Sequence, residues 1–130
     1  MTYIFKYCIA FLLVCVTLAG CSTHASPWKE WDTEKRTVFV ISNIAIAADW
    51  GSTLNLTERY DENYHERNRI LGRHPSRGDV NKYFVARTML NYQMARYLPD
   101  PWDKWSLSFT TVVHSKAAND NIGLGLEIDF

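Results

Sequence analysis

The chain has 130 residues, with 14 basic and 14 acidic side chains and a formal net charge of zero. This length suits one small domain, and the balanced charge lacks the basic excess that is typical of nucleic-acid-binding proteins, so we expect no nucleic-acid partner. Hydrophobic residues make up 47% of the chain, with five Trp and seven Tyr, which indicates a folded body rather than a disordered chain.

The first twenty residues have the layout of a bacterial secretory signal. One positive charge, Lys6, precedes an apolar run from Tyr7 to Leu18, and two small residues follow, Ala19 and Gly20. The apolar run is about a dozen residues long, whereas a helix that crosses a bilayer needs roughly 20, so cleavage is favoured over a permanent anchor. We therefore predict a lipoprotein signal peptide over residues 1–20.

The sequence Leu18-Ala19-Gly20-Cys21 resembles the lipobox of bacterial lipoproteins, in which the cysteine is acylated and becomes the first residue of the mature protein. The alternative is an ordinary signal peptide with a cysteine near its end. Several acyl chains, at about 0.8 kcal/mol per buried CH₂, give stable membrane attachment. Ser22 follows the cysteine, where an aspartate typically favours inner-membrane retention. We expect Cys21 to be lipidated and the protein to lie at the periplasmic face of the outer membrane.

Cysteine usage agrees with this interpretation. Cys8 and Cys15 fall within the signal, so Cys21 is the single cysteine of the predicted mature chain. A disulfide, a cysteine-based metal site and a thiol nucleophile are thereby excluded. Residues 21–33 are predicted to be a lipidated tether, and residues 34–130 a single small membrane-apposed domain.

The first predicted helix runs from about Glu34 to Glu58. Asp32 or Thr33 offers an N-cap, and the apolar segment that follows contains no proline. Apolar residues occupy several faces of this helix, so we expect it to be buried on most sides or to touch lipid.

A charged segment over residues 58–79 follows, with five Arg and five acidic residues, and predicts a long connection. The second helix is predicted from about Asp79, a candidate N-cap, to Leu98, because Pro99 cannot continue it. One side of this helix carries Arg87 and Asn91 among apolar residues, so the predicted core stripe is not purely apolar.

The segment after Pro101 is ambiguous. Trp102, Trp105 and Phe109 fit the spacing of a helix that starts at this proline, while alternation over Trp105 to Val113 fits a strand; the helix is favoured. The last nine residues, Ile122 to Phe130, alternate apolar and polar and predict a strand. The expected fold is mainly α, a small bundle of about three helices with a C-terminal β-strand. The alternative is an α+β fold with a C-terminal hairpin.

Four tryptophans fall near the predicted starts of the first and third helices: Trp28, Trp31, Trp102 and Trp105. Tryptophan is enriched at membrane–water interfaces. Packing in the core explains these positions equally well, so both interpretations stay open.

The segments DWGST and ERNRILGRHPS, together with the Gly-rich apolar end, resemble a family of uncharacterised small bacterial membrane-associated proteins. That family carries D-x-x-x-T on a helix and E-x-N-P-x-x-G ahead of the next helix; this chain reads E-x-N-x-x-L-G and has Arg69 where a proline is common. The resemblance covers the chain from the first motif to the C-terminus and implies no known reaction. It singles out Asp49, Thr53, Glu66 and Asn68.

Five residues form the candidate polar site: Asp49, Thr53, Glu66, Asn68 and His114. Asp49 and Thr53 are one helical turn apart and share a face. Burying an unpaired carboxylate is costly, so in a structural interpretation Asp49 accepts a hydrogen bond from Arg87, Arg96 or an amide and joins two helices. In a functional interpretation Asp49 converges with Glu66 and His114 as a metal site or an acid–base pair.

Sequence motifs do not favour the catalytic interpretation. The chain has no H-E-x-x-H, G-x-S-x-G or phosphate-loop motif, so we assign no catalytic residue, metal or cofactor. We expect a membrane-anchored envelope lipoprotein with a structural or protein-interaction role. It binds the membrane through its acyl chains, and another envelope protein is a candidate partner for Ile122 to Phe130. The alternatives are a small metal- or acid/base-dependent hydrolase, and a phage- or plasmid-type lysis or exclusion lipoprotein.

Overall fold

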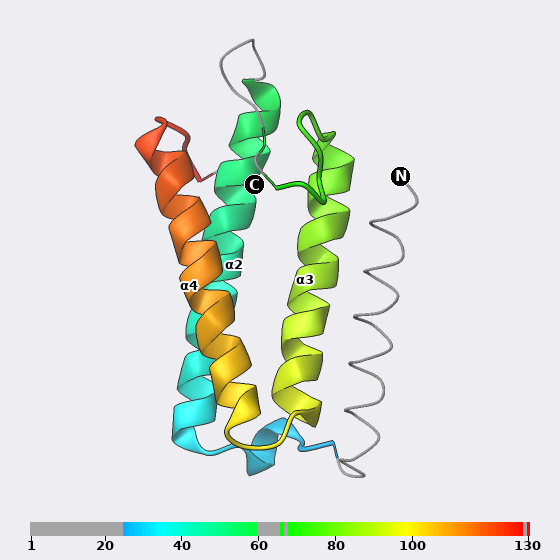
Figure 1. The fold of residues 1–130 in the computed structure, drawn as a ribbon, viewed down its shortest axis with the longest axis vertical. Coiled ribbons are helices and arrows are strands. Elements are labelled where there is room, and N and C mark those ends of the chain that lie inside the picture. Colours follow the sequence, from blue (N-terminus) through cyan, green and yellow to red (C-terminus); the bar gives the residue numbers. More distant parts are fainter. Residues whose placement is uncertain (1–24, 60–65, 67, 129) are drawn as a thin grey trace.

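The computed structural model describes residues 25–59, 66, 68–128 and 130. A short 3₁₀ helix, η1 (Trp28–Glu30), leads into three long helices, α2 (Thr33–Glu58), α3 (Arg77–Tyr97) and α4 (Trp102–Gly123). The three helices run alternately up, down and up along one long axis (Figure 1). The expectation of a mainly helical bundle is confirmed. The predicted signal peptide and Cys21 lie outside the described residues.

Local capping explains where α2 begins. The Asp32 side chain accepts a hydrogen bond from the backbone N–H of Lys35 at 2.7 Å, as an N-cap residue does. Acidic Glu34 in the first turn adds a favourable interaction with the helix dipole. The helix runs to Glu58 without a proline, so the predicted bounds are confirmed within one residue.

The second helix begins earlier than predicted. Ser76, not Asp79, is the N-cap of α3: its Oγ accepts from the backbone N–H of Asp79 at 3.2 Å and donates to Asp79 Oδ2 at 2.7 Å. Ser76 and Asp79 thus bond each other at the N-cap and N3 positions of a capping box, with Asp79 where Glu or Gln is usual. At the other end Leu98 is extended, with a ψ of 138°, as expected before Pro99.

The ambiguous segment is helical. Residues 105–113 lie within α4, so the alternative fold with a C-terminal hairpin is wrong for the described part of the chain. The buried positions of this helix explain the outcome, because Leu107, Thr110, His114 and Ala118 recur at a spacing of three or four. Alternating burial, which a strand would need, does not occur.

The strand predicted over residues 122–130 is not confirmed, since the described part of this segment contains no strand. Its first two residues complete α4, and a turn follows in which Gly125 has a φ of +81°. The chain then returns to α2, where the Glu127 N–H donates to Asn55 Oδ1 at 3.2 Å. Among the described residues of this segment Leu126 is the buried one, at 2% exposure. A side chain of α2 thus supplies a hydrogen bond that a partner strand would otherwise supply.

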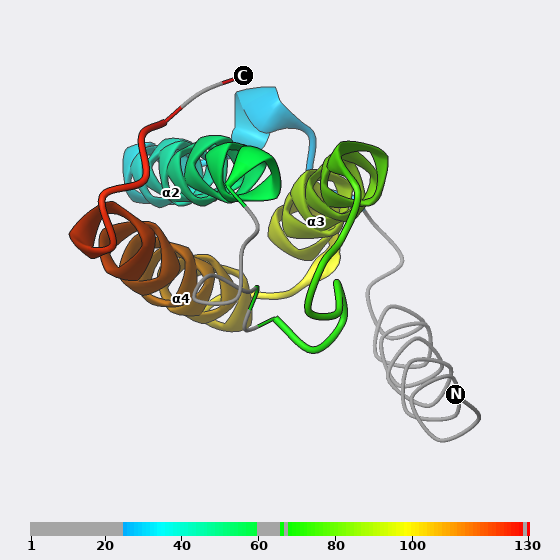
Figure 2. The same ribbon diagram turned by 90° about the horizontal axis from the view of Figure 1, so that it is seen from above.

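The core consists of two apolar clusters stacked along the bundle. Near the end of α2 the cluster is Ile46, Leu54, Val80 and Phe84. Near its start the cluster is Trp31, Ala95 and Leu107. Seen along the bundle, α2 and α4 lie side by side and α3 lies to one side of both (Figure 2). Polar side chains of all three helices meet beside the first cluster.

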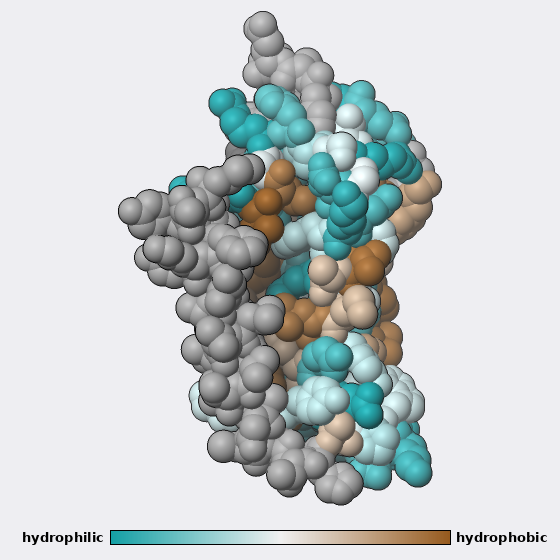
Figure 3. Space-filling model, turned by 90° about the vertical axis from the view of Figure 1, so that its right-hand side faces the viewer, coloured by the Kyte–Doolittle hydropathy of each residue, from teal (hydrophilic) through white to brown (hydrophobic). Residues whose placement is uncertain are grey.

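Apolar surface is also exposed. On the side of α3, apolar residues gather midway along the molecule, between hydrophilic residues at its two ends (Figure 3). Val85 and Met89 of α3 are 48% and 63% exposed. Of the described helices, α2 alone has the length and the apolar composition that would allow it to cross a membrane. However, 44% of its most apolar stretch is buried in the bundle, as in a core helix.

Ion pairs join the start of α2 to the start of α4. Lys35 Nζ lies 2.7 Å from Asp103 Oδ2, and both side chains are less than 10% exposed. Lys104 Nζ contacts Glu34 Oε2 at 3.0 Å and Asp32 Oδ2 at 3.1 Å. Hydrogen bonds to these two carboxylates raise the pKa of Lys104 above its usual range. These contacts set the position of α4 against α2, and hence of the polar residues farther along both helices.

Candidate functional site

Asp49 and Thr53 lie on the face of α2 that meets α4. Asp49 is 7% exposed and Thr53 is 2% exposed. Thr53 Oγ1 donates to Asp49 Oδ1 at 3.4 Å, so the predicted one-turn relationship produces a contact. The Asp49 carboxylate therefore sits within the bundle and requires further donors.

His114 of α4 is the main partner of Asp49. Its Nδ1 lies 2.7 Å from Asp49 Oδ2, and the imidazole is 2% exposed. On the other side of the ring, Arg87 Nε of α3 donates to His114 Nε2 at 3.1 Å. Because a guanidinium can only donate, Nε2 is the acceptor and Nδ1 carries the proton that is donated to Asp49.

Arg87 extends this chain of hydrogen bonds back to α4. Its Nη2 donates to Thr110 Oγ1 at 3.3 Å, one turn before His114. Asp49 does join two helices, as the structural interpretation expected, but its partner is His114 of α4. Arg87, the expected partner, contacts His114 and reaches Asp49 through it. Asp49 lies on α2, Arg87 on α3 and His114 on α4, and we call these three residues the three-helix tie.

Glu66 and Asn68 lie in the connection between α2 and α3. Asn68 N–H donates to Glu66 Oε1 at 2.6 Å, and Glu66 N–H donates to the Arg73 carbonyl at 3.0 Å. Asn68 Oδ1 accepts from the Ile70 N–H at 3.0 Å. These local bonds shape the turn that leads into α3.

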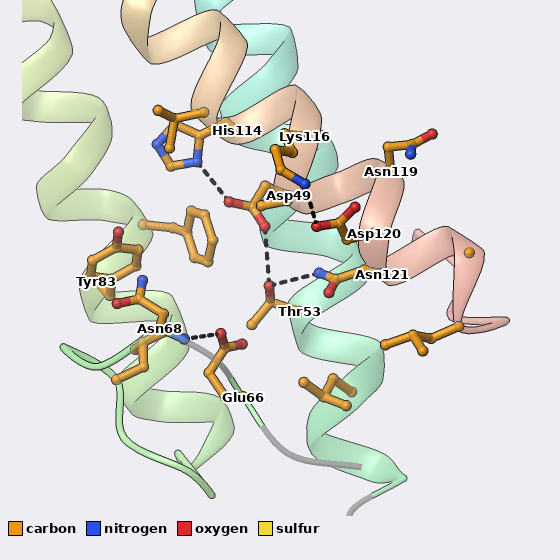
Figure 4. Close-up of a pocket in the computed structure, with 17 residues that line it drawn as sticks. Asp49, Thr53, Glu66, Asn68, Tyr83, His114, Lys116, Asn119, Asp120 and Asn121 are labelled. Atoms are coloured by element: carbon orange, nitrogen blue, oxygen red, sulfur yellow. Dashed lines mark hydrogen bonds and ion pairs between the residues drawn. The ribbon is translucent and has the colours of Figure 1, made fainter. Parts of the chain in front are cut away.

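One cavity of about 900 Å³ brings the predicted site residues together. Asp49, Thr53, Glu66, Asn68 and His114 all line it (Figure 4). The same view shows Glu66 and Asn68 on the connection, across the cavity from Asp120 and Asn121 of α4. The five residues that the sequence grouped as a candidate polar site share this cavity because the connection and the helices approach one another in the folded chain.

Sequence reasoning missed the residues that complete the cavity wall. Asn121 Nδ2 donates to Ser52 Oγ at 3.0 Å and to Thr53 Oγ1 at 3.4 Å, which joins the end of α4 to α2. Lys116 and Asp120 pair at 3.0 Å on the rim. The run Asn119-Asp120-Asn121 was the available signal, since it places three polar residues in the last turns of α4.

The geometry limits what chemistry the cavity can support. His114 Nε2, the nitrogen that would act as a base toward a bound molecule, already accepts from Arg87. Among the described residues, no three His, Cys, Asp or Glu side chains are placed to hold a metal ion. Asp49 and His114 do meet, as the hydrolase interpretation requires, but the Glu66 carboxylate is bonded within its own turn.

Comparisons with known proteins add no assignment. The chain matches no protein-family profile, no curated protein and no solved structure. The likeness carried by the two short motifs therefore stays a prediction, and the functional conclusion depends on the residues of this chain.

Proposed function

We propose that the protein is a membrane-anchored envelope lipoprotein whose helical domain has a structural or protein-interaction role. The observation that carries the proposal is Leu18-Ala19-Gly20-Cys21 at the end of a short apolar run. Acylation of Cys21 would attach the chain stably to a membrane. Ser22 favours delivery to the periplasmic face of the outer membrane.

The three-helix tie supports a structural rather than a catalytic role for the polar site. All three of its side chains are engaged with one another, and the base nitrogen of the imidazole is occupied. A hydrolase acting through Asp49 and His114 would first have to displace Arg87 from Nε2. Buried polar groups that satisfy one another in this way specify how helices pack.

Lipidation is tested by intact mass and fatty-acid labelling of the protein made in a bacterium with two membranes. We expect a mature form that begins at Cys21 and carries the label. Cys21→Ser should lose the label and remain unprocessed. Cys15→Ser, the same substitution within the signal, should still be labelled and cleaved. A mature form that begins elsewhere, or a labelled Cys21→Ser variant, would contradict the proposal.

For the interaction role we propose residues 122–130 as the contact with another envelope protein. Ile122, Leu124 and Ile128 are each about half exposed. Apolar side chains that remain exposed at the end of a folded domain are a common basis for association. We propose that the residues after the turn at Gly125 pair with the edge of a partner's sheet, where main-chain bonds supply affinity.

A further inference from the structure

The chain that leads from Cys21 is attached firmly to one end of the bundle. The Ser26 N–H donates to the Arg96 carbonyl at 3.0 Å, and Trp31 Nε1 donates to the Ser26 carbonyl at 2.9 Å. Trp31 is 4% exposed and packs with Ala95 and Leu107. We call this region, residues 25–36 and 96–105, the lower end; it is at the bottom of Figure 1.

The length of the tether places the lower end close to any lipid on Cys21. Ser26 lies five positions after Cys21, and an extended chain spans at most about 3.6 Å per position, so the two residues are within about 18 Å of each other. The bundle is much longer, because the 26 residues of α2 extend about 39 Å. A lipid at Cys21 therefore keeps the lower end close to the membrane, whereas the tether alone does not fix the tilt of the bundle.

Three of the five tryptophans are exposed at this same end. Trp28 is 44% exposed on η1, and Trp102 and Trp105 are 66% and 69% exposed in the first turns of α4. Trp102 and Trp105 are three residues apart and so share a face of the helix. Tryptophan combines a large apolar ring with one N–H donor, which suits the boundary between lipid headgroups and acyl chains.

Charge at the lower end neither attracts nor repels an anionic surface strongly. Residues 27–36 contain three basic and three acidic side chains, and residues 96–104 contain two of each. Attraction to anionic lipid normally depends on a local excess of Lys and Arg. The chemistry of this end therefore fits the interface of a zwitterionic bilayer, with the aromatic rings as the contact.

We propose that Trp28, Trp102 and Trp105 insert into the lipid–water interface and hold the bundle with its lower end on the bilayer. This inference depends on the proposed lipidation of Cys21, which brings the tryptophans to the surface. The anchor then sets the distance of the domain from the membrane, and the tryptophans set its orientation. The upper end, with the cavity and residues 122–130, faces away from the lipid.

The test uses the full acylated protein in phosphatidylcholine vesicles whose acyl chains are either normal or brominated. Bromine quenches only tryptophans that reach the acyl region. We expect brominated vesicles to quench the wild-type emission. Trp102→Phe/Trp105→Phe should lose roughly two-thirds of the quenched emission, because two of three inserted rings are gone. Both side chains are mostly exposed, so the substitutions should change stability little.

Trp50→Phe is the matched control. Trp50 lies in the upper half of α2, and its Nε1 donates to Asn81 Oδ1 at 2.9 Å; the variant should keep all of the quenched emission. A protein that is acylated and floats with the vesicles but is not quenched would overturn the inference and leave the lipid anchor intact. Quenching that appears only after phosphatidylglycerol is added would also overturn it. A protein that carries no acyl chain would refute the proposed function and this inference together.

Discussion

His114 Nδ1 donates to Asp49 Oδ2 at 2.7 Å across 65 positions of the chain, and both residues are nearly buried. Arg87 Nε holds the other ring nitrogen at 3.1 Å, so the imidazole bridges a carboxylate on α2 and a guanidinium on α3. A buried imidazole that is bonded at both nitrogens restricts the relative rotation of all three helices. The stability of the bundle should therefore depend on each member of the three-helix tie.

Asp49→Asn should lower the free energy of unfolding by about 1.5–3 kcal/mol, because it removes a charged acceptor from a buried hydrogen bond. Thermal unfolding by circular dichroism measures the effect. Asp120→Asn is the control: Asp120 pairs with Lys116 on the exposed rim, where an ion pair contributes little. If Asp49→Asn leaves the melting temperature unchanged but abolishes an envelope phenotype, the functional interpretation of Asp49 is correct instead.

The tautomer of His114 is a second prediction. Nitrogen-15 NMR of the imidazole should show a proton on Nδ1 and none on Nε2, since Arg87 donates to Nε2. Arg87→Met should destabilise the bundle, because it leaves a buried ring nitrogen without its donor. A wild-type protein with its proton on Nε2 would show that the tie is not formed as described.

The buried pair of Lys35 and Asp103 should couple the starts of α2 and α4. Lys35→Met alone should cost roughly 3–5 kcal/mol, since it leaves the Asp103 carboxylate uncompensated. Lys35→Met/Asp103→Asn should recover most of this loss, because Asn retains an acceptor for the Lys104 N–H, which bonds Asp103 Oδ1 at 2.7 Å. Denaturant unfolding of the two single variants and the double variant gives the coupling energy. Strictly additive losses would show that the two residues do not interact.

Acid should weaken the cap of α2. The Lys35 N–H and then the Lys104 side chain lower the pKa of Asp32 below its usual value of 3.8. A carboxyl whose pKa is lowered on folding contributes stability above 3.8, and this contribution is lost as the pH falls through the folded value. Asp32→Asn keeps the cap acceptor without the titration, so its melting temperature should fall less steeply below this pH. Equal slopes for the two proteins would contradict the prediction.

Hydrogen exchange can locate the partner contact at the C-terminus. The Glu127 N–H bonds Asn55 Oδ1 and should be protected in the acylated protein alone. The neighbouring Ile128 N–H should gain protection only when membrane extract is added, if residues 122–130 bind a partner. Asn55→Ala should remove the protection of Glu127 in both samples. Unchanged fast exchange at Ile128 in both samples would rule out this segment as the contact.

Features that depend on neighbouring residues were predictable from the sequence. Helix α2 follows from Asp32 and an uninterrupted run of helix-compatible residues, because capping bonds and helical hydrogen bonds join positions three or four apart. The end of α3 follows from Pro99, which acts on the residue before it. The start of α3 was misplaced because both Ser76 and Asp79 can cap, and the bonds between them decided in favour of Ser76.

Features that depend on packing were decided only by the tertiary structure. The pattern in residues 105–113 favoured a helix but also allowed a strand, and burial of Leu107 and Thr110 against the other two helices decided for the helix. The alternation in residues 122–130 suggested a strand, but a strand requires a neighbour, and the segment meets α2 instead. The sequence identified Asp49 as a carboxylate in need of a donor. Which donor it received, His114 rather than Arg87, depended on the distance between helices, which no local pattern encodes.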